Sequence, residues 1–290
     1  MNNQNRLRDK LAKKEFTVTV ELDPPKGVSV KQTLQAADLL AGSVDAVNIA
    51  DSPMANMKMS PIALCHLIQE NINLETIFHL TCRDRNIIGL QSELLGAAAL
   101  GVQNLLILTG DDPKNGDHHN VKGVFELDSV GLVKIAATLN RGYDYMNNPL
   151  NEAANFFIGV AVNPAAKDLD KEIEKFEKKI KAGACFAQTQ PVYDLDKISK
   201  FLERTRQFNI PILIGLLPIK SSKMARYLDE KVPGISISKE IQDRIKLKGR
   251  EAGIEIAREM LIELKKIADG VHIMPIGDSN LVLEVVDGII

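Results

Sequence analysis

The sequence predicts a single (β/α)8 TIM barrel, and three observations support this fold class. Short apolar segments alternate with helical patterns along the chain, which is typical of parallel βα units. Eight strand segments can be assigned, which favours a closed barrel, with an open doubly wound sheet as the alternative topology. The length of 290 residues fits one barrel of roughly 250 residues. We therefore expect one domain over residues 1–290.

The strands are expected where four to six mostly apolar residues lie between polar or glycine-containing turns. The first of them, TVTVEL, alternates polar and apolar residues. Its Thr and Glu side chains should face the inside of the barrel, and its Val and Leu side chains should pack beneath the helices. The expected strands are Thr17–Leu22, Ala46–Ile49, Thr76–Leu80, Leu105–Thr109, Phe157–Val162, Cys185–Gln190, Ile212–Leu217 and Gly270–Met274.

Helices are expected between the strands, where apolar residues recur every three or four positions. Two polar segments rich in Asn, Asp and Gly, residues 111–123 and 142–155, are too long for simple connectors and are expected as surface loops. The expected helices are Val30–Leu40, Pro61–Glu70, Ile87–Leu100, Leu169–Ala182, Leu195–Arg206, Ser222–Glu230, Ile241–Ile267 and Leu281–Val286.

Composition and charge exclude several classes of protein. The 36 basic and 38 acidic residues give a net charge of -2, so no basic field would attract a nucleic acid. No apolar run approaches the roughly 20 residues that span a bilayer, and the N-terminus lacks an apolar signal segment. Three widely separated cysteines indicate free thiols. We therefore expect a cytoplasmic protein with no nucleic-acid or membrane partner.

Polar side chains cluster where the expected strands end. In a barrel the loops that follow the strands form the active-site mouth, so residues at these ends should converge on one rim. No glycine-rich dinucleotide fingerprint or phosphate-binding loop occurs, so a nucleotide would have to bind differently. The candidates from six strands are Glu21, Asn48, Asp51, His79, Thr81, Arg83, Asp84, Thr109, Gly110, Asp111, Asn163, Gln188 and Gln190.

Glu21 is the candidate general acid. Its place in the alternation puts it inside the barrel, where burial disfavours the charged carboxylate. We expect its pKa to be raised, so that the group stays protonated and can donate a proton. The alternative is a solvated or salt-bridged glutamate at a strand end.

Other motifs carry weaker signals. Gly110 in LTGDDP would let a ligand approach the backbone, while Asp111 would accept hydrogen bonds. His79 is either a ligand-binding residue or a core histidine. No metal site is expected, because the His and Cys spacing fits no standard pattern. The stretch KEIEKFEKKIKAG predicts an amphipathic helix with a solvated charged face.

Five motifs in order resemble the methylenetetrahydrofolate reductase family. They are VELDPPKG, HLTC, LTGDDP, KKIKAGACFAQTQPVYD and IGLLPIKS, and they extend from about Phe16 to the last strand. The motifs ELDPPKG and TCRDRNIIGLQSELLG most resemble those of the subgroup that is often fused to a homocysteine methyltransferase domain.

The resemblance implies a barrel that uses flavin to reduce 5,10-methylenetetrahydrofolate to 5-methyltetrahydrofolate. FAD is the implied cofactor, with FMN as the alternative, and NAD(P)H is an implied electron donor. Glu21 matches the general acid, Asp111 a carboxylate contacting pterin and flavin, and Gln190 the amide that orients the folate. Cofactor-binding positions match Asn48, Ala50, His79, Thr109, Gly110, Asp111, Glu172, Lys178 and Lys179, the lysines serving a pyrophosphate.

Departures from the family pattern leave the electron donor open. Ala50 stands where the family commonly has Thr, Asn163-Pro164 replaces Tyr-Pro, Ser222 replaces an aromatic residue, and an arginine is missing near Asp278. One alternative is therefore a flavin- and folate-binding subunit that receives electrons from a partner protein. Another is a flavin-free, pterin-dependent methyltransferase barrel. An electron-transfer or methyltransferase partner and an oligomeric assembly are expected.

Overall fold

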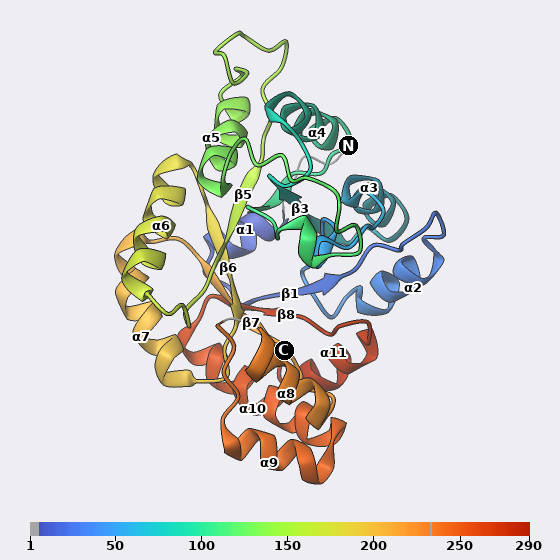
Figure 1. Ribbon diagram of the computed structural model, residues 1–290, viewed down its shortest axis with the longest axis vertical. Helices are drawn as coiled ribbons and strands as arrows, with labels where there is room; N and C mark the ends of the chain where they lie inside the picture. Colours follow the sequence, from blue (N-terminus) through green and yellow to red (C-terminus); the bar gives the residue numbers. More distant parts are fainter. Residues whose placement is uncertain (1–5, 233) are drawn as a thin grey trace.

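Eight parallel strands form a closed barrel in the computed structural model, which describes residues 6–232 and 234–290 (Figure 1). Each strand pairs with its sequence neighbour, and β8 closes on β1. The predicted barrel is confirmed, and the open sheet is excluded. The strands are β1 (Thr17–Leu22), β2 (Ala46–Ile49), β3 (Glu75–Thr81), β4 (Asn104–Leu108), β5 (Phe157–Val162), β6 (Phe186–Pro191), β7 (Ile212–Leu216) and β8 (Gly270–Ile273).

Helices surround the barrel (Figure 1). Three short 3-10 turns, η1 (Pro53–Ala55), η2 (Pro113–Asn115) and η3 (Arg206–Phe208), lie in the connections. The helices are α1 (Arg6–Ala12), α2 (Lys31–Leu40), α3 (Pro61–Ile72), α4 (Ile87–Ala99), α5 (Ser129–Asn140), α6 (Leu169–Ala182), α7 (Leu195–Thr205), α8 (Ser222–Lys231), α9 (Lys239–Lys248), α10 (Arg250–Ile267) and α11 (Ser279–Val286).

Three helical features differ from the sequence prediction. Helices α1 and α5 were not expected, and the segment Ile241–Ile267 is two helices instead of one. Gly249 separates α9 from α10 because its φ of +57° lies in the left-handed region, which ends a helix. In α5 the cap is Asp128, whose side chain accepts a hydrogen bond from the Gly131 N–H.

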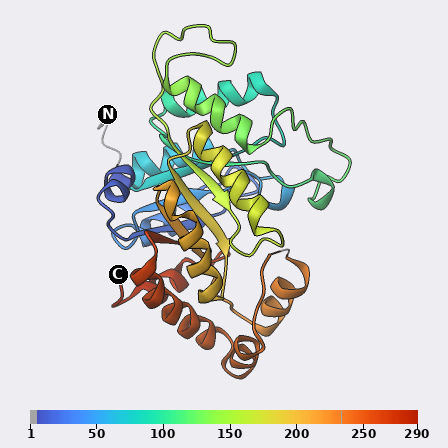
Figure 2. The ribbon, with the colours of Figure 1, turned by 90° about the vertical axis from the view of Figure 1, so that its left-hand side faces the viewer.

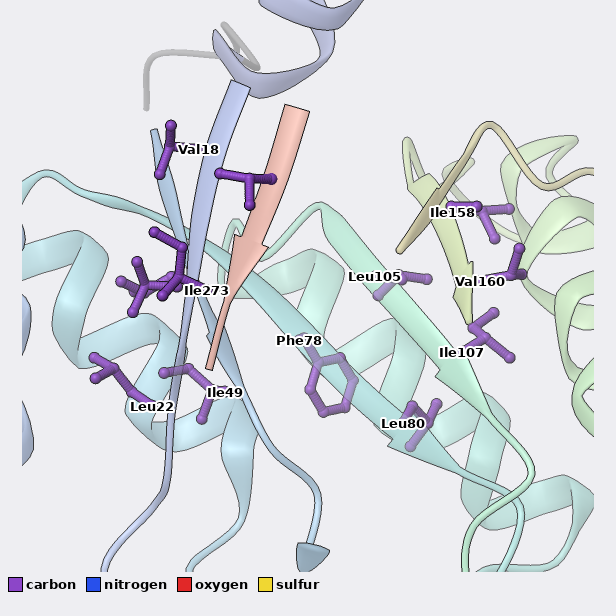
Figure 3. Packing of buried hydrophobic residues seen from close by; sticks show 14 of the residues in the cluster. Val18, Leu22, Ile49, Phe78, Leu80, Leu105, Ile107, Ile158, Val160 and Ile273 are labelled. Atoms are coloured by element: carbon purple, nitrogen blue, oxygen red, sulfur yellow. The ribbon is translucent and has the colours of Figure 1, made fainter. Parts of the chain in front are cut away.

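Apolar side chains are buried on both faces of the strands, and a further cluster lies among α8, α9 and α10. On the outer face, alternate strand residues such as Val18, Phe78 and Ile107 pack beneath the helices (Figure 3). On the inner face, a smaller cluster fills the end of the barrel where the strands begin, and Phe157 stacks there on Phe186 with ring centroids 4.8 Å apart. The alternation expected for the first strand is therefore confirmed.

Helix α1 closes the end of the barrel where the strands start. Leu7 and Leu11 are buried in the inner cluster. The Glu75 carboxylate at the start of β3 accepts hydrogen bonds from the N–H groups of Arg6 at 2.6 Å and Leu7 at 3.1 Å. These bonds satisfy N–H groups that a helix start leaves unpaired. The plugged end leaves the carboxyl ends of the strands as the place for a site.

Loops at the carboxyl ends of the strands are tied to one another. The Asp117 carboxylate, in the loop after β4, contacts the Lys26 ammonium at 2.6 Å and accepts a hydrogen bond from the Met57 N–H at 3.0 Å. Gly116 lies so close to the Ala55 carbonyl that a Cβ would approach it to 1.9 Å. The loop around η2 projects on the side opposite the N-terminus (Figure 2). Within the described residues, no helix is long and apolar enough to cross a membrane.

Candidate active site

The carboxyl ends of the strands bring most of the predicted site residues to one rim. Glu21 on β1 pairs in register with Asn48 on β2, and His79 follows on β3. Asn48 and His79 are buried, and so is Ala50 just beyond β2. Gln190 near the end of β6 is exposed toward solvent. The barrel therefore forms a polar mouth with Glu21 on its wall.

Glu21 lies beside an imidazole that sequence analysis did not single out. The His272 Nε2 atom on β8 is 3.9 Å from the Glu21 Oε2 atom, and the side chains are 3% and 31% exposed. His272 interrupts the apolar strand GVHI at an inward-facing position. That alternation was the signal available in the sequence.

The expectation of a raised pKa for Glu21 is wrong for the ligand-free protein. Burial acts to raise the pKa, but the interactions of the carboxylate with the imidazoles of His272 and His79 together outweigh it, so the pKa lies below its usual value. The Glu21 charge in turn helps raise the pKa of Asp23, where burial is the larger cause. Glu21 is therefore a carboxylate at neutral pH before any ligand binds.

His79 is a neutral imidazole at physiological pH. Burial lowers its pKa to about 4, although the negative charges of Glu21 and Asp51 act in the opposite direction. Its Nε2 atom is 2.8 Å from the Asn48 amide nitrogen. A neutral ring with one donor and one acceptor can bind an uncharged heterocycle without introducing a charge into the mouth.

The lowered pKa of His79 makes the folded protein sensitive to acid. Below pH 6.5 the unfolded chain binds a proton at this histidine while the folded chain does not, so stability falls as the pH drops from 6.5 toward 4. At about 1.4 kcal/mol per pKa unit, the loss reaches about 3 kcal/mol. Urea unfolding of wild type and His79→Gln at pH 7 and pH 4.5 checks this, because the wild type should lose more stability. Parallel losses in both proteins would contradict it.

A buried ion pair joins the ends of β2 and β3. The Asp51 side chain is 3% exposed, and its Oδ2 atom is 3.0 Å from Arg85 Nη1. The same oxygen accepts hydrogen bonds of 2.9 Å from both the N–H and the hydroxyl of Thr81. Because these bonds tie the loop after β2 to the end of β3, they fix the wall of the mouth next to His79.

A bulge in β6 separates the roles of its two glutamines. The pairing with β7 shifts register between Gln188 and Pro191, and the Thr189 hydroxyl accepts a hydrogen bond from the Gly215 N–H at 2.9 Å. An extra residue re-aims the side chains that follow it. Gln188 is buried in the barrel, while Gln190 is exposed and free to contact a substrate.

The end of β4 supplies the predicted turn. Gly110 has a φ of +93°, and a Cβ there would lie 3.0 Å from the side chains of Thr81 and Arg83. The glycine is therefore required both by its backbone conformation and by close packing. The Thr109 hydroxyl accepts a hydrogen bond from the Ser129 N–H at 3.2 Å, and Asp111 is exposed at the start of the loop.

Residues on and before α6 are held by local contacts. The Glu172 carboxylate accepts a hydrogen bond from the Asn163 N–H at 2.9 Å. The buried Lys179 ammonium donates to the Ala161 carbonyl at 2.6 Å, and burial lowers its pKa to about 8. Lys178 is exposed and pairs with Glu174 at 2.7 Å, as expected for a solvated helix face. Lys178 makes no described contact with the mouth. The contact predicted between Lys178 and a cofactor pyrophosphate stays a prediction.

The bottom of the mouth fits an uncharged planar ring such as that of a flavin. His79, Asn48 and Gln188 form a buried layer of neutral side chains that hydrogen-bond to one another, so a flat ring can lie over them without a charge being buried against it. This layer contains no cluster suited to an ion: no group of three or more His, Cys, Asp or Glu in the described part of the chain could hold a metal.

Comparisons with known proteins found similar sequences and similar folds. The sequence model of the methylenetetrahydrofolate reductase family matches residues 6–289. Methylenetetrahydrofolate reductase 1 of Schizosaccharomyces pombe is 27% identical over 301 residues, which cover 95% of this chain and 46% of that protein. The 5,10-methylenetetrahydrofolate reductase of Salmonella typhimurium is 26% identical over 235 residues, covering 78% of this chain and 73% of that protein.

The chain spans less than half the length of the first eukaryotic relatives it matches. Among solved structures, a Clostridium thermocellum protein described as binding two copies of 5-methyl-5,6,7,8-tetrahydrofolic acid superimposes with a TM-score of 0.64. That match covers 97% of this chain and 98% of the other at 16% sequence identity, which shows a shared fold.

Proposed function

Because the chain belongs to the methylenetetrahydrofolate reductase family, we propose that it reduces 5,10-methylenetetrahydrofolate to 5-methyltetrahydrofolate with a bound flavin. The observation that carries this proposal is the placement of Glu21 at the rim of a neutral, buried polar layer, 3.9 Å from His272. A carboxyl group there can exchange a proton with a substrate lying across the mouth. The folate bound by the structural neighbour supports the substrate class.

Glu21 acts as the general acid in this proposal. Reduction requires the five-membered ring of the folate to open, and protonation of the departing nitrogen promotes that step. The ligand-free carboxylate is charged, but 31% of its side chain is exposed, so a planar pterin would remove further water from it. Loss of water raises a carboxyl pKa, and burial is already the largest single influence on this group.

We therefore expect Glu21 to take up a proton when the folate binds. Isothermal titration calorimetry of 5-methyltetrahydrofolate binding near neutral pH, in buffers of different ionisation enthalpy, should show proton uptake by the wild-type protein. Glu21→Gln should bind the folate without that uptake. Equal proton uptake in the two proteins would show that another group takes the proton.

The remaining residues bind and orient. Gln190, exposed beyond the β6 bulge, hydrogen-bonds and orients the folate, and Asp111 accepts hydrogen bonds from the pterin. Asn48, Ala50, His79, Thr109 and Gly110 line the place of the flavin, which supplies the hydride when bound. Glu172, Lys178 and Lys179 serve its pyrophosphate. FAD is the proposed cofactor, with FMN as the alternative.

The proposed electron donor is NAD(P)H or a partner protein. A rice relative named as a probable NADH-dependent methylenetetrahydrofolate reductase is 27% identical over 214 residues and supports the nicotinamide donor. The departures from the family pattern at Ala50, at Ser222 and near Asp278 are the reason for proposing a partner protein as the alternative donor. We also propose one domain for residues 1–290 and an oligomer that acts in the cytoplasm.

An anaerobic absorbance titration tests the function. Protein purified or reconstituted with FAD should be yellow, should bleach on reduction, and should regain its colour when 5,10-methylenetetrahydrofolate is added, with formation of 5-methyltetrahydrofolate. Bleaching by dithionite but by neither NADH nor NADPH would assign the donor to a partner protein. Failure of the folate to restore the colour would reject the reductase, and colourless protein with folate affinity would favour the methyltransferase barrel.

A further inference from the structure

A continuous chain of hydrogen-bonding side chains crosses the barrel interior beneath the mouth. Each member is at most 4% exposed, so water does not interrupt the chain. It starts at His79 on β3, ends at His272 on β8, and approaches Glu21 at that end. The links are Asn48 Nδ2 to His79 Nε2 at 2.8 Å, Asn48 Nδ2 to Gln188 Oε1 at 2.7 Å, Gln188 Nε2 to Thr19 Oγ1 at 3.0 Å, and Thr19 Oγ1 to His272 Nδ1 at 2.9 Å.

The amide orientations give the chain a direction. The Asn48 amide nitrogen has two hydrogens, one for the Gln188 carbonyl and one for His79. The His79 Nε2 atom must therefore accept, which places the proton of this neutral ring on Nδ1. The Gln188 amide nitrogen donates to Thr19 and, at 3.2 Å, to the Asn48 carbonyl, so both amides use all their hydrogens.

Thr19 continues the same direction of hydrogen-bond donation to His272. Its oxygen accepts from Gln188, so its single hydroxyl hydrogen must be donated elsewhere. The His272 Nδ1 atom at 2.9 Å is a better acceptor than the Val271 carbonyl at 3.5 Å. With Nδ1 accepting, neutral His272 carries its proton on Nε2, the atom that faces Glu21.

We propose that Gln188 is a positioning residue that, together with Asn48, fixes the tautomer of His272 so that its Nε2–H points at the Glu21 carboxylate. The chain also has a reversed arrangement. If Glu21 is protonated and donates to His272 Nε2, then His272 Nδ1–H donates to Thr19 and the Thr19 hydroxyl donates to a turned Gln188 carbonyl. The Asn48 amide must turn with Gln188, so that His79 carries its proton on Nε2. The protonation of Glu21 is thereby linked to the orientation of a side chain on β6.

The tautomer is a property of the ligand-free protein, whereas its effect on turnover rests on the proposed reductase function. In that function, Gln188→Met should slow folate reduction with little change in the KM for the folate, because Gln188 touches Glu21 only through Thr19 and His272. The rate loss should be smaller than that caused by Glu21→Gln. A KM effect alone would point to a role in shaping the mouth.

Nuclear magnetic resonance of 15N-histidine-labelled protein tests the tautomer directly. In ligand-free wild type at neutral pH we expect His272 as the Nε2–H form and His79 as the Nδ1–H form, with signals assigned from His272→Gln and His79→Gln. Gln188→Met keeps an unbranched side chain of similar length but removes the amide. His272 should then populate both tautomers, because Thr19 can accept from its Nδ1–H.

Two variants on β1 control for general disruption, and a third interrupts the chain at another point. Thr17→Val removes a hydroxyl that donates to the Glu15 carbonyl outside the chain, and Thr19→Ser keeps the linking hydroxyl, so both should retain the wild-type tautomer. Thr19→Val interrupts the chain independently and decides the matter if Gln188→Met does not fold. An Nδ1–H form of His272 in wild type, or a folded interrupted variant with an unchanged tautomer, would overturn the proposal. No flavin or folate is needed, so a failed reductase assay would leave this result intact.

Discussion

Glu21→Gln should slow the reduction of 5,10-methylenetetrahydrofolate by about 10²–10⁴-fold, the usual contribution of a general acid. The amide keeps the size of the side chain but cannot deliver a proton to the opening ring. Single-turnover oxidation of the reduced flavin by the folate measures this step, and the rate of flavin reduction by any accepted donor should stay close to that of wild type.

The matched control is Glu203→Gln, an exposed glutamate on α7. It makes the same chemical change away from the strand carboxyl ends and should leave both rates unchanged. A folate rate for Glu21→Gln within a factor of two of wild type would remove Glu21 from the mechanism. Equal losses in both half-reactions would instead indicate a role in binding the flavin.

Asp51→Ala should destabilise the fold by about 3–5 kcal/mol, the cost of removing one partner from a buried ion pair. The change leaves the half-buried Arg85 guanidinium without this partner and removes the acceptor for two hydrogen bonds from Thr81. Equilibrium urea unfolding measures the loss as a lower midpoint with an unchanged slope.

An exposed ion pair provides the comparison for Asp51. Glu174→Gln breaks the pair with Lys178, in which both side chains are 61% exposed, and should cost about 0.5 kcal/mol or less. A loss below 1 kcal/mol for Asp51→Ala would show that the link between β2 and β3 does not hold the mouth together.

The strands could be predicted well because their signals are local. The bounds of Thr17–Leu22, Ala46–Ile49 and Phe157–Val162 agree with the structure, since alternating or continuous apolar runs end at polar turns. Helix α5 was missed because SVGLVKIAATLN lies between two long polar loops and contains glycine and β-branched residues. The break at Gly249 depends on a single positive φ inside an otherwise helical pattern.

The sequence was enough to predict where the site lies, but not the pKa of its central carboxyl group. Alternation along one strand was enough to turn Glu21 into the barrel. Its lowered pKa depends on His272, which is 251 residues away in sequence and is brought beside it only when β8 closes on β1. The buried chain through Gln188 likewise needs side chains from five strands, β1, β2, β3, β6 and β8, which only the closed barrel brings together. These are contacts between residues far apart in the sequence. A sequence pattern can show that each residue faces the barrel interior, but not which residue it contacts there.

A crystal structure with FAD and 5-methyltetrahydrofolate bound would show whether both molecules lie in the mouth of the barrel. The isoalloxazine is expected at the carboxyl ends of the strands beside His79 and Gly110, with the pterin within hydrogen-bond reach of Glu21 and Gln190. Flavin or folate bound at the opposite end of the barrel, beside α1, or a pterin beyond the reach of Glu21, would contradict the account.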